Sequence, residues 1–78
     1  MKIDIKEIQN LLYVCNVNFY DMYVDTEHMD LIIEFNELLE NVDMDELMNE
    51  LNDLFREENV EFNGDDVIYI NLLDEGVY

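Results

Sequence analysis

Four residue types are missing from this chain of 78 residues: alanine, proline, serine and tryptophan. Cysteine and histidine occur once each, as Cys15 and His28. A lone cysteine excludes an internal disulfide, and one cysteine with one histidine falls short of a tetrahedral zinc site. Without serine there is no Ser-His-Asp triad. We therefore expect no enzymatic activity, no metal and no cofactor.

The chain also lacks long apolar segments. Its uninterrupted apolar runs are only a few residues long, far below the roughly 20 residues of a membrane-spanning helix. Residues 1–6 contain no extended apolar stretch of the kind that marks a secretory signal peptide. No linker, repeat or low-complexity tract divides the sequence, and its length suits one core. We expect a single domain, residues 1–78, located in the cytoplasm.

Basic residues are scarce as well. Twenty-one Asp and Glu oppose only Lys2, Lys6 and Arg56, which gives a formal net charge of −18 at pH 7. Solubility of a small domain needs a net charge of only about 2–8, and the excess destabilises the compact state by self-repulsion. Direct binding to nucleic acid or to an anionic membrane is strongly disfavoured, because no basic patch can neutralise phosphates. The expected partner is a basic protein.

The amount of charge suits a partner that normally binds nucleic acid. A globule of this length has a radius of gyration near ~11–12 Å, hence a diameter of roughly 30 Å. B-DNA carries one phosphate charge per ~1.7 Å of its axis, so the same length holds about 18 charges. The two totals agree.

Two segments show helical periodicity. Asp4-x-x-Glu7 has the form of a capping box, and one face of the following helix, expected over about 4–15, carries Ile5, Ile8, Leu11, Leu12 and Cys15. A second capping box, Asp43-x-x-Glu46, opens the clearest pattern in the chain. It predicts a helix over about 43–58 with an apolar stripe of Met44, Leu47, Met48, Leu51, Leu54 and Phe55.

Alternating apolar and polar residues predict strands at Val17–Asp25 and Met29–Phe35, joined by a loop at residues 26–28. A short strand, Val60–Phe62, leads through Asn63-Gly64, a type I′ turn signal, into a strand at Val67–Leu72. Residues 36–42 fit either a short helix or a loop. The expected fold class is α+β, in the order α-β-β-α-β-β, with two helices on one face of a small antiparallel sheet.

Two catalytic or metal-binding interpretations compete with plain structural roles. Cys15 and His28 can be imagined as a nucleophilic pair, but Cys15 lies on an apolar helix stripe and His28 in a turn, which favours a core residue and a solvated residue. The segment 59–65 loosely matches an EF-hand calcium loop. Position 12 of that loop must be a bidentate Glu and is Ile70 here, and a strand pattern stands where the exiting helix belongs.

The first candidate for partner binding is an acidic stripe on the second helix: Glu46, Glu50, Asp53 and Glu57. At i, i+4, i+7 and i+11 they share one face over ~16.5 Å. Like charges at this spacing destabilise a helix by ~0.2–0.5 kcal/mol each, and no Lys is interleaved among them. The alternative is a merely solvated helix face.

The second candidate is the strand face that bears Asp21, Tyr23 and Asp25 together with Phe19. Aromatic rings among carboxylates suit contacts with Arg and Lys, through cation–π interactions and ion pairs. Alternatively, Phe19 and Tyr23 cover the edges of the core or pack under the C-terminal tail. Asp65 and Asp66, at the tip of the last hairpin, are expected to join the acidic stripe.

Small size, intense acidity and an Asp-, Glu- and Asn-rich α+β chain without catalytic residues resemble the phage-encoded DNA-mimic inhibitors of the anti-CRISPR and anti-restriction type. The resemblance is compositional and covers the whole chain. It implies a non-enzymatic inhibitor that occupies the nucleic-acid groove of a nuclease or CRISPR effector in the host cytoplasm. The alternative is an acidic immunity or antitoxin-type protein, or an adaptor, that binds one basic protein partner without such a groove.

Overall fold

The computed structural model of the chain describes residues 4–73 and 75. Its elements are α1 (Ile5–Val14), β1 (Tyr20–Asp25), β2 (Asp30–Phe35), η1 (Leu39–Asn41), α2 (Met44–Leu54), η2 (Glu57–Asn59), β3 (Val60–Phe62) and β4 (Val67–Asn71), where η1 and η2 are short 3-10 turns. The α+β class and the order of helices and strands agree with the expectation. The ambiguous segment 36–42 contains the turn η1.

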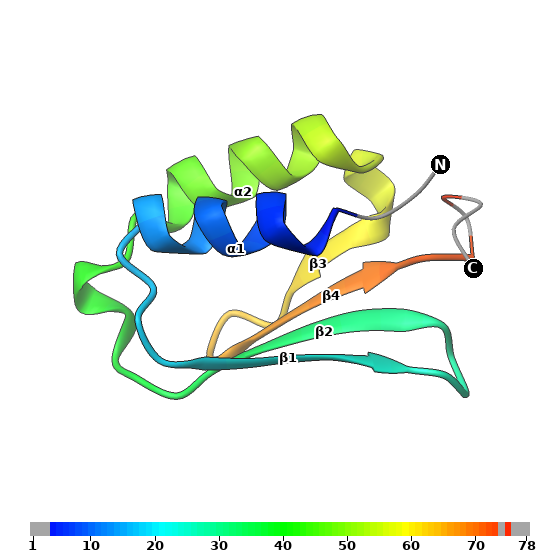
Figure 1. Ribbon diagram of the computed structural model, residues 1–78, viewed down its shortest axis with the longest axis horizontal. Helices are drawn as coiled ribbons and strands as arrows, with labels where there is room; N and C mark the ends of the chain where they lie inside the picture. The colour runs from blue at the N-terminus through cyan, green and yellow to red at the C-terminus, as the bar shows by residue number, and fades with distance from the viewer. Residues whose placement is uncertain (1–3, 74, 76–78) are drawn as a thin grey trace.

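The four strands form one sheet in the order β1-β2-β4-β3, and every neighbouring pair is antiparallel. Both helices lie over the same face of this sheet (Figure 1). The core lies between the two layers, and its fully buried members are Ile8, Leu12, Cys15, Leu31, Ile33, Leu47, Leu51, Ile68 and Ile70. Because side chains alternate along a strand, every second strand residue points away from the helices.

Both helices begin where the capping boxes predict. The Asp4 side chain accepts a hydrogen bond from the Glu7 backbone N–H at 3.2 Å, and Asp43 does the same for Glu46 at 3.1 Å. Each bond satisfies one of the free N–H groups of a first helical turn. Among the described residues, no helix combines the length and the apolar character that crossing a bilayer requires.

Helix α1 ends in a Schellman motif, which delays the start of β1 from Val17 to Tyr20. Asn16 takes a left-handed conformation with φ 70°. The Val17 N–H then donates to the Leu12 carbonyl at 2.8 Å and the Asn16 N–H to the Tyr13 carbonyl at 3.1 Å, as this motif requires. Val17 is buried against the core and lies outside the sheet.

Helix α2 ends at Leu54, so the expected end at about 58 is wrong. Phe55 has extended backbone angles, φ −129° and ψ 162°, and its ring packs into the core. The chain must reverse before β3 begins at Val60, and a helix continued to 58 leaves no residues for that reversal. Glu57 therefore lies in the separate turn η2.

The last hairpin has a four-residue loop, residues 63–66, so the expected two-residue type I′ turn is wrong. Gly64 has φ 82°, whereas Asn63 is not among the residues with positive φ, and type I′ needs both. Instead the Asn63 side-chain oxygen accepts from the N–H groups of Asp65, Asp66 and Val67 at 2.9, 2.9 and 3.0 Å. Strand β4 follows this loop, which contradicts the EF-hand alternative.

Candidate partner-binding surfaces

The face of the sheet away from the helices carries a row of apolar and aromatic side chains. Tyr23 on β1 lies opposite Ile32 on β2, and Ile32 lies opposite Tyr69 on β4. Tyr23 is 46% exposed, whereas Ile32 between the two tyrosines is only 8% exposed. Within residues 4–73, neither helix covers this face (Figure 1), so the flanking rings shield Ile32. The row thus presents the two aromatic rings to solvent.

Carboxylates flank this row on both sides. Asp21 pairs with Glu34 at one end of β1, and Asp25 pairs with Asp30 at the other. Asp21 and Asp25 are four residues apart, which places the two carboxylate rows ~14 Å from each other. On β3, Glu61 lies opposite Tyr69, so a further carboxylate follows the aromatic row across the sheet. We call the side chains of this surface the bare face: Asp21, Tyr23, Asp25, Asp30, Ile32, Glu34, Glu61 and Tyr69.

Hydrogen bonds hold two of these carboxylates in place. The Tyr23 hydroxyl donates to Glu34 Oε1, and Asn36 Nδ2 donates to Asp21 Oδ2 at 2.9 Å. The bond to Glu34 raises the pKa of Tyr23, with smaller contributions from desolvation and from neighbouring charges. The phenol therefore stays protonated and keeps its donor role. None of the four strands that the structure describes contains Lys or Arg, so the bare face has one sign of charge.

A shallow hollow of about 380 Å³ lies at the Tyr69 end of the bare face, lined by Asp30, Glu58, Asn59, Glu61, Tyr69 and Asn71. Asn59 is buried at its wall and donates through Nδ2 to Glu75 Oε2. Three carboxylates around an aromatic ring provide the ion-pair and cation–π contacts that a guanidinium or ammonium group makes. The hollow is thus chemically suited to an Arg or Lys side chain.

The acidic stripe is shorter than predicted. Glu46, Glu50 and Asp53 are exposed on α2, but Glu57 lies beyond the break at Phe55, so the four residues do not share one helix face. Burial raises the pKa of the Cys15 thiol at the end of α1, and the charges of Asp43, Glu46 and Glu50 add to that rise. Cys15 itself is buried in the core, which confirms its predicted core position.

The other predicted residues lie on the sheet or in its loops. Asp21, Tyr23 and Asp25 share the bare face, and Phe19 and Tyr23 are both exposed, although Tyr23 flanks the buried Ile32. The alternative that these rings pack under the C-terminal tail concerns residues 74 and 76–78, which lie outside the described residues. Asp65 and Asp66 are exposed at the hairpin tip. The Asp66 carbonyl accepts from the Phe35 N–H at 2.7 Å, which places the tip at the end of the sheet near Glu34 instead of beside the acidic stripe.

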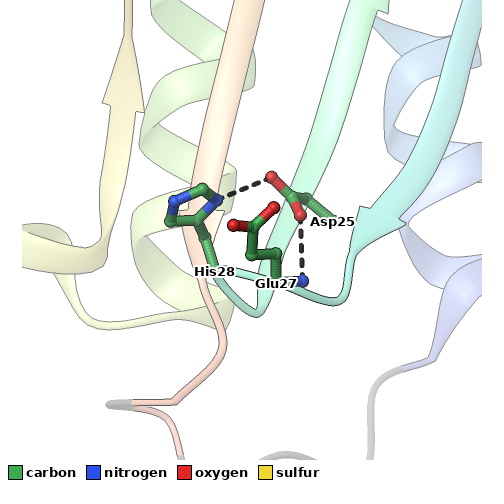
Figure 2. Close-up of side chains that lie close together, drawn as sticks. All are labelled: Asp25, Glu27 and His28. Atoms are coloured by element: carbon green, nitrogen blue, oxygen red, sulfur yellow. Dashed lines mark hydrogen bonds and ion pairs between the residues drawn. The ribbon is translucent and has the colours of Figure 1, made fainter.

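The turn between β1 and β2 gathers Asp25, Glu27 and His28 (Figure 2). His28 Nδ1 lies 2.9 Å from Asp25 Oδ2, and the Glu27 N–H donates to Asp25 Oδ1 at 3.0 Å. The three side chains offer ligand atoms within 4.8 Å of one another. The bond to Asp25 raises the pKa of His28 and lowers that of Asp25. A cation at this turn would compete with the Asp25–His28 bond for the same carboxylate.

We expect the His28 pKa to fall when Asp25 is replaced by Asn. The pKa of His28 is raised from its ordinary value of 6.5, and that of Asp25 is lowered from 3.8. The pair therefore stabilises the fold most between these two pH values. The stability is lost below that range as Asp25 protonates, and above it as His28 loses its proton. NMR titration of the imidazole measures the change, with Glu27→Gln as the control. An equal His28 pKa in the wild type and in Asp25→Asn would contradict the pair.

Several bare-face residues escaped prediction from the sequence, namely Asp30, Ile32, Glu34, Glu61 and Tyr69. Alternation in β2 does put Asp30, Ile32 and Glu34 on one side. The missing information was that β4 pairs with β2 and brings Tyr69 opposite Ile32. The bare face can be recognised from the order of the strands in the sheet, and alternation within a single strand does not reveal that order.

Comparisons of the chain with protein-family models, with curated proteins and with solved structures find no match. The case for a function therefore rests on the bare face and the acidic stripe.

Proposed function

We propose that this protein is a non-enzymatic inhibitor that binds the basic nucleic-acid groove of a nuclease or CRISPR effector as a nucleic-acid mimic. The observation that carries the proposal is the bare face. It presents carboxylates in two rows around exposed tyrosine rings, and its strands contain no basic residue. The net charge of −18 extends the same sign over the rest of the molecule.

The bare face offers the two kinds of group that a nucleic-acid groove recognises. Lys and Arg in such a groove contact phosphates, and carboxylates supply the same charge. Grooves for single strands also use aromatic and Arg side chains that stack on bases, and Tyr23 and Tyr69 supply comparable π faces. Asp21 and Glu34 are already fixed by hydrogen bonds. Such preorganisation reduces the entropy cost of binding.

The acidic stripe contributes differently. Glu46, Glu50 and Asp53 lie on the helix layer, on the other side of the sheet from the bare face (Figure 1). A partner seated on the bare face does not touch them directly. Their charge adds to the long-range field, which raises the association rate and is screened by salt.

The same surface also suits an adaptor or an immunity-type protein that binds one basic partner without a nucleic-acid groove. Tyrosines are common energetic anchors of protein interfaces, and Tyr23 and Tyr69 lie between the two rows of carboxylates. Both functions need a basic protein, and they differ in whether nucleic acid competes for the site.

Competition with DNA tests the proposal. The partner is recovered from host cells on the immobilised protein, and its binding to labelled DNA is then measured by fluorescence anisotropy as the inhibitor is added. We expect DNA to be displaced fully, with a midpoint that rises as salt increases, because charge contacts are screened. A ternary complex in which the partner holds both DNA and this protein would refute groove mimicry and support the adaptor.

A further inference from the structure

Strand β1 is an edge of the sheet, paired with β2 on one side. An edge strand presents backbone N–H and C=O groups to any added strand, and proteins usually blunt such edges with lysine, proline or a bulge. β1 has none of the three: its sequence is YDMYVD, and all six residues pair in unbroken register with β2. The edge is therefore geometrically able to accept another strand.

The two faces of β1 differ in chemistry next to this edge. A groove of about 510 Å³ runs along β1 beside α1. Its apolar lining comes from Ile5, Met22, Val24 and Leu31, and Gln9, Tyr20, Asp21 and Tyr23 complete the lining. Ile5 and Val24 are each 41% exposed, although both are apolar. On the other side Asp21, Tyr23 and Asp25 belong to the bare face. An added strand would meet apolar groups with one set of alternate side chains and carboxylates with the other.

The charge decides what kind of strand fits. Pairing with the β1 edge of a second copy brings Asp21 and Asp25 of each chain together in two molecules of charge −18, and like charges on adjacent strands repel. A strand with Lys or Arg at alternate positions places opposite charges there instead. The acidic residues of β1 thus disfavour pairing with a second copy of this chain and leave the edge open to a basic segment.

We propose that the β1 edge binds an extended protein segment in which apolar residues alternate with Lys or Arg, by adding it as a fifth strand to the sheet. Backbone hydrogen bonds supply the affinity of such strand addition, and alternate side chains supply the specificity. The apolar residues enter the groove beside Val24, and the basic residues lie over Asp21 and Asp25. The inference depends on the sheet edge and stands whether or not the bare face mimics nucleic acid.

Synthetic peptides test strand addition directly. The probe is a short peptide that alternates valine and lysine, and the control has the same composition in shuffled order. We expect the alternating peptide to bind about tenfold more tightly and to slow hydrogen exchange at the β1 amides. N-methylation of alternate peptide residues removes donors along one edge only, so one methylation pattern should abolish binding and the other should leave it.

Variants of the protein locate the contact. Val24→Asn should weaken binding of the alternating peptide, whereas Val14→Asn, at an exposed position of α1, should not. Circular dichroism confirms that both variants fold. Equal binding of the alternating and shuffled peptides, or binding that survives both methylation patterns, would overturn strand addition. So would a dimer at about 0.15 M NaCl that Val24→Asn dissociates, because the edge would then take a second copy.

Discussion

Neutralising four carboxylates of the bare face is expected to weaken partner binding by at least about a hundredfold, since close charge pairs at interfaces couple by ~1.5–7 kcal/mol each. The variant combines Asp21→Asn, Asp30→Asn, Glu34→Gln and Glu61→Gln. The amide oxygens still accept the hydrogen bonds that Asn36 and Tyr23 donate, so the fold should persist. Surface plasmon resonance measures both rate constants, and we expect most of the loss in the dissociation rate.

The acidic stripe provides a control with the same change of charge: Glu46→Gln, Glu50→Gln, Asp53→Asn and Glu57→Gln. We expect this variant to associate more slowly and to dissociate at the normal rate, because charges outside a contact act through the long-range field. Its fold should be as stable or slightly more stable, since repulsion within α2 is relieved. Equal losses in both variants would mean that total charge alone drives binding. A larger loss in the control would assign the contact to the acidic stripe.

Leu51→Ala is expected to unfold most of the protein. Leu51 lies on α2 with 0% exposure, and shortening a buried leucine to alanine costs ~2–5 kcal/mol. The core of so small a domain supplies only about 3–5 kcal/mol in total, and the net charge of −18 opposes compaction further. Urea titration followed by circular dichroism measures the loss, and added salt should recover part of it by screening the repulsion.

Leu38→Ala is the matched control for this substitution. Leu38 is 79% exposed, so the same loss of side-chain atoms should change the free energy of unfolding by less than about 0.5 kcal/mol. If Leu38→Ala were as harmful as Leu51→Ala, the division between core and surface described above would be wrong.

Local signals in the sequence predicted where both helices begin. Asp4 and Asp43 mark both helix starts, and the alternation in β2 and β4 identifies their buried and exposed sides. These features depend on residues only a few positions apart, which is why the sequence alone reveals them. The helix stripe that includes Leu47 and Leu51 was predicted for the same reason.

Tertiary constraints account for the errors. The apolar period of α2 continues through Phe55, but the need to reverse the chain before β3 ends the helix at Leu54 and removes Glu57 from the acidic stripe. In the last hairpin, the Asn63 side chain replaces a backbone turn. The bare face depends on the pairing of β2 with β4, residues far apart in the sequence. The spacing of acidic residues along the sequence therefore favoured the acidic stripe as the first candidate, because the bare face cannot be recognised without the strand pairing.

The two-layer arrangement also has an evolutionary consequence. In β2 and β4 the residues that build the core, such as Ile33 and Ile68, alternate with residues that face solvent, such as Tyr69. A mutation at an exposed outward position such as Tyr69 leaves the contacts of the core intact. The surface that we propose for partner binding can thus change one residue at a time while the core contacts are kept.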